Sequence, residues 1–172
     1  MRQKLGLMTE MEGDSQLIET LENNLEMVET DMTIFFRKLS EFNKNTIIDE
    51  NDAGFLNIIE TAFYNKEELN KGHIGFWRDW FGQYLARLEK ETATNEARKI
   101  VMDSVNPKYV LRNYMAQMAI DKADNGDYSL ISELHELLKK PYDDQPEFEN
   151  WFAKRPEWAR NKVGCSMLSC SS

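Results

Sequence analysis

Apolar residues recur at three- and four-residue spacing along most of the chain, a pattern that predicts a series of amphipathic α-helices. The clearest stretch runs from Asn106 to Ala123, where we expect a central helix that Asn106 caps and Pro107 begins. Asn125-Gly126 would end it, because both residue types tolerate a positive φ angle. The predicted buried face consists of Val110, Leu111, Tyr114, Met115 and Met118.

The same spacing predicts helices on both sides of this segment, with Asp14 or Ser15 and then Asp31 as caps of the first two. We expect helices over about residues 14–28, 31–42, 55–63, 75–91, 92–104 and 129–140, followed by a short aromatic piece that begins at Pro146. No stretch shows convincing strand alternation. The sequence therefore predicts an all-α, bundle-like fold of about six to eight helices over residues 1–160, followed by a flexible tail at 161–172.

The segment from Gly75 to Glu91 carries an aromatic face. Its apolar members at helical spacing are Phe76, Trp77, Trp80, Phe81, Tyr84, Leu85 and Leu88. Large rings supply much of the buried area of a core, so we interpret this face as core rather than as a cofactor site.

Composition narrows the class of protein. The chain has 172 residues, which suits one domain, and a net charge of −9 that opposes binding to nucleic acid or to an anionic membrane. It has no apolar run long enough to span a bilayer and no signal-peptide pattern. We expect a soluble chain without a targeting signal, cytoplasmic by default.

Candidate chemistry is confined to the end of the chain. The sequence lacks a phosphate-binding glycine loop, a nucleophile elbow and a zinc-site spacing, so we expect no catalytic, cofactor-binding or metal-binding residue. Cys165 and Cys170 are the two cysteines, and a flexible tail could bring them to disulfide geometry. Nearby, Lys162 and Arg160 alone could lower a thiol pKa. We regard the two cysteines as a candidate redox pair.

Several ordered pieces of the sequence resemble the C-terminal part of the selenoprotein O (SelO, YdiU) family, and together they cover nearly the whole chain. These pieces are Lys4-Leu5-Gly6-Leu7, Asp31-x-Thr33-x-Phe35-Phe36-Arg37, Trp80-x-x-x-Tyr84-x-x-Arg87-Leu88, Asn106-Pro107-x-x-x-Leu111-Arg112-Asn113-Tyr114, Gly126-Asp127-Tyr128-Ser129, Pro141-Tyr142-Asp143, Arg155-Pro156-x-Trp158 and Ser169-Cys170-Ser171-Ser172. Each piece is short, but their order makes accidental similarity improbable.

The resemblance implies a kinase-like parent, a SelO-like pseudokinase that transfers AMP from ATP to hydroxyl groups of proteins with a divalent metal such as Mg²⁺. The nucleotide-binding and catalytic segments of the family lie upstream of the matched region, so Met1 resembles an internal residue of a longer chain. Cys170 matches the position of selenocysteine in animal relatives, where the residue is associated with redox control and pairs with another cysteine. A eukaryotic parent would be mitochondrial.

The leading hypothesis is therefore a C-terminal fragment that supports the parent's kinase-like core, inactive alone, with the core and the parent's protein substrates as partners. The first alternative is a stand-alone interaction module that binds through Trp77, Trp80 and Trp151. The second is a small thiol oxidoreductase that uses Cys165 and Cys170.

Overall fold

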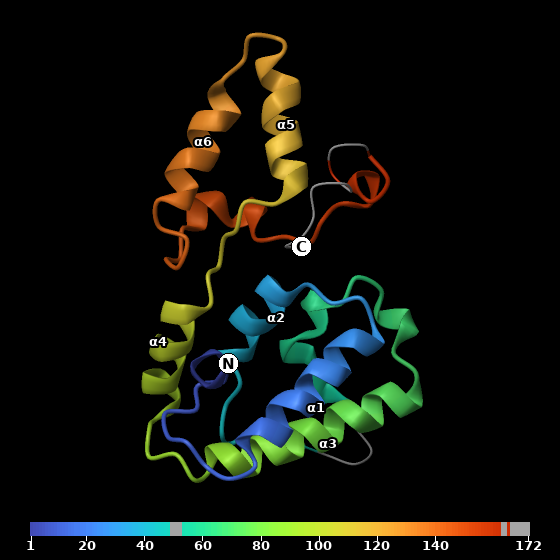
Figure 1. Cartoon of the computed structure of the whole chain (residues 1–172), viewed down its shortest axis with the longest axis vertical. Helices are drawn as coiled ribbons and strands as arrows, with labels where there is room; N and C mark the ends of the chain where they lie inside the picture. The colour runs from blue at the N-terminus through green and yellow to red at the C-terminus, as the bar shows by residue number, and fades with distance from the viewer. Residues whose placement is uncertain (49–52, 163–164, 166–172) are drawn as a thin grey trace. The chain divides into compact units, whose positions relative to one another are not determined.

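The computed structural model describes residues 1–48, 53–162 and 165 and confirms the all-α prediction. The chain divides into two compact units, unit 1 (Met1–Asn106) and unit 2 (Pro107–Ser172), each considered by itself below (Figure 1). Within the described ranges there is no β-strand, only an isolated bridge between Thr30 and Phe63. No helix among the described residues is long and apolar enough to cross a membrane. The division into residues 1–160 and 161–172 remains a prediction.

The described residues of unit 1 form four α-helices, with α1 and α3 packed side by side (Figure 1). Their bounds are α1 Asp14–Met27, α2 Met32–Leu39, α3 Lys71–Leu88 and α4 Asn95–Val105. Short 3₁₀ helices cover Arg2–Leu5, Gly54–Ile58, Glu60–Ala62 and Lys66–Glu68. The expected helix at 55–63 is thus 3₁₀, where backbone bonds from Asp31 to Ala62 and from Tyr64 to Glu29 hold the chain against the start of α2.

Helix starts in unit 1 agree with the sequence in part. Asp31 caps α2 as expected, because its carboxylate accepts a hydrogen bond of 3.0 Å from the Ile34 N–H. α3 begins a turn earlier than expected, since the Asn70 side chain accepts from the His73 N–H at 3.0 Å. Asp14 was wrongly expected as a cap: it is the first residue of α1 and makes no capping bond.

The aromatic face of α3 forms the core of unit 1, as predicted. Trp77, Trp80, Phe81 and Tyr84 are all fully buried, and the rings of Trp80 and Tyr84 stack at 4.9 Å. The polar atoms of the two stacked rings are satisfied, because Trp80 Nε1 donates to the Leu17 carbonyl and Tyr84 Oη donates to the Leu5 carbonyl. Phe76 is the exception on this helix, with 55% of its surface exposed.

Unit 2 is built on a helical hairpin of α5 (Asn113–Ala123) and α6 (Ser129–Leu138) (Figure 1). Gly126 has a φ angle of 79° in the turn between them, as its predicted role requires. Two 3₁₀ helices, Pro146–Trp151 and Glu157–Ala159, complete the unit. Its core consists of Tyr109, Tyr114, Met115, Ala119, Leu130, Leu134, Leu137, Trp151, Ala159 and Cys165.

The predicted start of the central helix is wrong. Asn106 is the C-cap of α4, and α5 begins only at Asn113. The intervening chain is not helical because the N–H groups of Lys108 and Tyr109 both donate to the Pro141 carbonyl, at 2.8 and 3.0 Å. As a consequence Leu111 lies before the helix and is 55% exposed, whereas we expected it to be buried.

Candidate functional site

Cys165, one member of the predicted redox pair, lies in the core of unit 2 and is only 5% exposed. Its N–H donates to the Lys162 carbonyl at 3.0 Å, and its own carbonyl accepts from Asn113 Nδ2 at 3.4 Å. Cys165 is thus buried, whereas the division at residue 161 stays a prediction. Cys170 lies outside the described residues, so the pairing of the two thiols stays a prediction.

The chain before Cys165 is fixed to α5 by two kinds of contact. Lys162 Nζ forms an ion pair of 2.6 Å with Asp121 and lies 5.4 Å from the centre of the Trp158 ring. Trp158 in turn meets the Tyr114 ring edge to face at 6.3 Å. The segment that precedes Cys165 thus contacts α5, and the side chain of Cys165 itself is buried in the core of unit 2.

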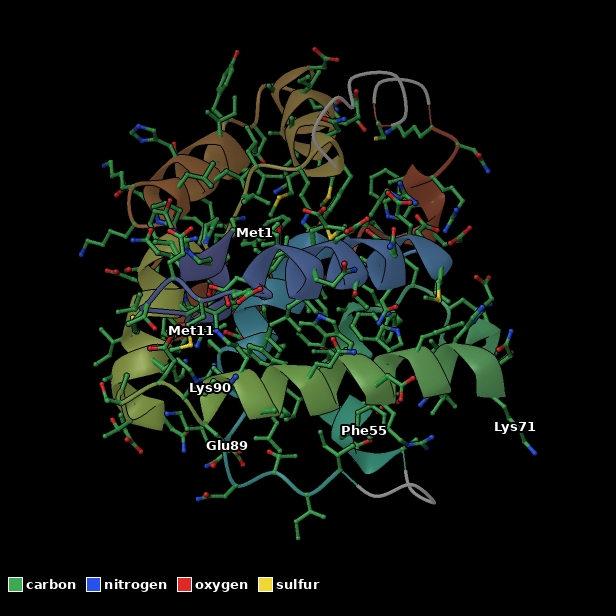
Figure 2. The ribbon with its side chains drawn as sticks, turned by 60° about the horizontal axis from the view of Figure 1, so that its bottom comes forward. Met1, Met11, Phe55, Lys71, Glu89 and Lys90 are labelled. Carbon is green, nitrogen blue, oxygen red and sulfur yellow. The ribbon has the colours of Figure 1, made fainter. Side chains whose placement is uncertain are left out.

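Three buried charged groups of the described residues form a different cluster, in unit 1. Arg87 on α3 contacts Asp14 at 2.6 Å and Glu91 at 2.9 Å, and its Nη2 donates to the Thr9 carbonyl at 2.8 Å. Thr9 also donates its N–H and its hydroxyl to Glu91. Figure 2 shows the place of this cluster, where Met11 lies beside the end of α3 near Glu89 and Lys90. We name it the Arg87 cluster.

The pKa values in the Arg87 cluster show which protonation state it requires. Burial would raise the pKa of Asp14, but hydrogen bonds from Arg87 and from the Met11 N–H outweigh it, so the pKa of Asp14 is lowered. Burial likewise opposes ionisation of Glu91, yet Thr9 and Arg87 lower its pKa. Both carboxylates are thus held ionised by hydrogen bonds and by the one guanidinium that they share, an arrangement that suits structure rather than acid–base chemistry.

A second buried cation, Arg98 on α4, joins three segments of unit 1. Its guanidinium donates to the Phe42 carbonyl and to Tyr84 Oη, the latter at 3.2 Å, and Gly6 lies against its aliphatic part. Burial raises the pKa of Tyr84 to about 12 although Arg98 opposes the shift, so Tyr84 is a neutral hydrogen-bonding residue at ordinary pH.

The described residues do not supply a metal site: they contain no group of three or more His, Cys, Asp or Glu side chains that could hold an ion. The acidic residues drawn together by the fold, Asp14 and Glu91, are both engaged by Arg87. The hypothesis of an interaction module that binds through three tryptophans is wrong on this point. Trp77 and Trp80 are fully buried and Trp151 is 9% exposed, so they do not form a binding surface.

Comparison with known proteins identifies the class of protein. Residues 1–139 match the sequence model of the family described as "Protein adenylyltransferase SelO". The chain belongs to this family, which confirms the resemblance drawn from its motifs.

The chain is similar to curated bacterial proteins named "Protein nucleotidyltransferase YdiU". It is 54% identical to the protein of Flavobacterium johnsoniae over 169 residues, 98% of this chain and 32% of the relative. Identity is 46% with the protein of Rhodopirellula baltica and 43% with that of Nitrosospira multiformis, each over 98% of this chain and 33% of the relative. The chain thus spans about a third of the length of the relatives it matches.

Proposed function

We propose that this chain is the helical C-terminal part of a SelO-like protein adenylyltransferase, inactive by itself, which supports a kinase-like core supplied by the rest of the polypeptide. The observation that carries this proposal is the coverage: 98% of the chain matches only 32% of the Flavobacterium relative. The parent would transfer AMP from ATP to a hydroxyl of a protein substrate and release pyrophosphate.

In this proposal ATP and Mg²⁺ are held by the part of the parent that this chain lacks. The chemistry of the described residues supports that assignment, since the buried carboxylates of Asp14 and Glu91 are both paired with Arg87, whose positive charge opposes a cation at the same place. The residues of this chain provide packing and a fixed N-terminal segment, and we assign no step of the transfer to them.

Redox control is a separate proposal for the C-terminal cysteines. A Cys165–Cys170 disulfide would form by exchange with an external disulfide, which is reduced to two thiols as the pair is oxidised, and because the side chain of Cys165 is buried we expect this exchange to need a local opening of unit 2. A disulfide between these two cysteines would therefore accompany a change in how the end of the chain packs.

The test of the proposed function uses a chimera in which this chain replaces the matching third of the Flavobacterium relative. We expect the chimera and the intact relative to attach AMP from labelled ATP to protein in the presence of Mg²⁺, and the isolated chain to attach none. Transfer by the isolated chain would contradict the proposal. So would a folded but inactive chimera, since the chain would then not replace its counterpart.

A further inference from the structure

Helix α3 presents a side to solvent whose composition is unusual for an exposed helix face. This α3 outer face lies opposite the aromatic core and consists of the exposed Lys71, Gly72, Phe76, Asp79, Gly82, Gln83 and Ala86 together with the half-buried Gly75. Lys71 and Asp79 are its two charged residues, and Phe76 exposes 55% of its surface. In Figure 2, with α1 on one side of α3 and the segment of Phe55 on the other, no helix crosses in front of α3.

The solvent face of the neighbouring helix provides the comparison. On α1 the exposed positions are Ser15, Gln16, Glu19, Glu22, Asn23 and Glu26, a polar and acidic set typical of a face that stays in water. The two helices belong to one unit and one chain. The exposed residues of α1 and α3 therefore differ in composition although both helices belong to one unit, and a cause specific to α3 is needed.

Two glycines of α3, Gly75 and Gly82, are not explained by contacts among the described residues, whereas Gly72 lies beside the side chain of the cap residue Asn70. A Cβ atom at Gly75 or Gly82 would meet no described atom within 4 Å, and neither residue has a positive φ angle. Glycine lowers the stability of a helix interior, so its presence at two such positions needs a compensating contact. A backbone that approaches α3 closely from outside would supply that contact, since only small residues leave room for it.

An open groove follows the same face. It has a volume of about 520 Å³ and is lined by Ile48, Arg78, Asp79, Gly82 and Gln83. Phe76 is exposed on the same helix but is not among these lining residues, and it lies about a third of a turn around the helix axis from Gly82. This combination of an exposed aromatic residue and polar neighbours is typical of a surface that packs against protein.

We propose that the α3 outer face is where the remaining part of a full-length family polypeptide packs. The inference rests on the proposed function, in which this chain is one part of a longer protein. The relatives supply the argument for this occupant, because about two thirds of the Flavobacterium protein lies outside the match to this chain. Covering the face would bury Phe76 and would give the glycines of α3 a partner.

The test measures the accessibility of one engineered thiol in two contexts. Gln83→Cys on the α3 outer face and Asn23→Cys on the exposed face of α1 are made in the isolated chain and in the chimera with the Flavobacterium relative. Maleimide labelling is followed by peptide mapping, which separates these thiols from Cys165 and Cys170. We expect Cys at position 83 to react at least about tenfold more slowly in the chimera, because it reacts only when the packed surface opens. Cys at position 23 should react equally in both.

Equal labelling of position 83 in an active chimera would overturn the inference while leaving the proposed function intact. Slow labelling already in the isolated chain, together with the mass of a dimer, would identify a second copy as the occupant and would also overturn it. If the chimera does not fold, the same two substitutions are made at the aligned positions of the intact relative.

A second variant tests packing rather than access. Gly82→Arg adds a long side chain to the α3 outer face, where the isolated chain has open space. We expect it to lower the melting temperature of the chimera but not of the isolated chain, while Asn23→Arg changes neither. An unchanged melting temperature of the Gly82→Arg chimera would contradict the inference.

Discussion

In unit 1, Arg87 lies among carboxylates that are as enclosed as the guanidinium itself, whereas in unit 2 the corresponding cation has exposed partners. The side chains of Asp14 and Glu91 are 5% and 2% exposed. Lys108 of unit 2 is 11% exposed, but its partners Asp144 and Glu149 are 68% and 57% exposed. Lys108 also lies over the rings of Tyr109 and Phe152.

The comparison shows that the stability lost when an ion pair is broken depends on how exposed its carboxylates are to water. Removing a cation from an enclosed cluster leaves buried charges without compensation, while exposed carboxylates are simply hydrated again. Unit 1 should therefore depend on its ion pairs for folding, and unit 2 should depend on its apolar core.

The largest expected effect comes from Arg87→Met. It should lower the free energy of unfolding by roughly 3–5 kcal/mol, because Asp14 and Glu91 remain buried and unpaired. Lys108→Met is the matched variant in unit 2 and should cost about 0–1 kcal/mol. Urea unfolding followed by circular dichroism measures both. Equal losses would contradict the distinction between the two units.

The Arg87 cluster also predicts a response to acid. The folded-state pKa values of Asp14 and Glu91 are lowered, so their contribution is complete above the ordinary carboxyl range and is lost as the pH falls through the folded values. The Arg87→Met variant lacks the guanidinium but keeps the hydrogen bonds from Met11 and Thr9, so both pKa values should be higher than in the wild type. The stability difference between wild type and variant should therefore narrow below about pH 4.5. A difference that is constant from pH 7 to about pH 3 would exclude this linkage.

In unit 2 the large effects should come from apolar residues. Met115 is 1% exposed, and Met115→Ala should cost roughly 2–5 kcal/mol because it leaves a cavity. Leu111→Ala should cost less than about 0.5 kcal/mol, since Leu111 is 55% exposed and lies before α5. Thermal or urea unfolding compares the pair. If Leu111→Ala lowered the free energy of unfolding more than Met115→Ala, the result would support the helix start at Pro107 that the sequence alone predicted.

The smallest effects concern two glycines of unit 1 and should have opposite signs. Gly82→Ala should stabilise the isolated chain by about 0.5–1 kcal/mol, because alanine favours the helix and meets no neighbour. Gly6→Ala should destabilise it by roughly 1–3 kcal/mol, since Gly6 has a φ angle of 68° and an added Cβ would overlap the side chain of Arg98. Melting curves of the two variants test the sign. Destabilisation by Gly82→Ala would show that the space beside α3 is occupied within the chain.

The sequence predicted those features of the fold that depend on residues close together in the chain. The aromatic spacing of α3 specified both a helix and its buried side, because one continuous face contacts one core. The cap at Asp31 followed from a side chain and an N–H group three residues apart. The Gly126 turn followed from its backbone freedom.

Contacts between distant residues account for what the sequence did not predict. The chain after Pro107 has a good helical pattern, but it is held extended by the carbonyl of Pro141. Arg87 and Asp14 are 73 residues apart, so no pattern along the chain indicates their ion pair. Cys165 lies in a small, polar stretch typical of a mobile tail, yet contacts with α5 fix it in the core.

The measurement that tests the central claim most directly is a calorimetric titration of the isolated 172-residue chain with ATP and Mg²⁺. The claim is that this chain is a structural part of a SelO-family protein whose nucleotide site lies elsewhere in the polypeptide. It predicts no saturable heat for the isolated chain and a saturable signal for the chimera with the Flavobacterium relative. Micromolar, magnesium-dependent binding by the isolated chain, abolished by substituting acidic residues within it, would contradict the account.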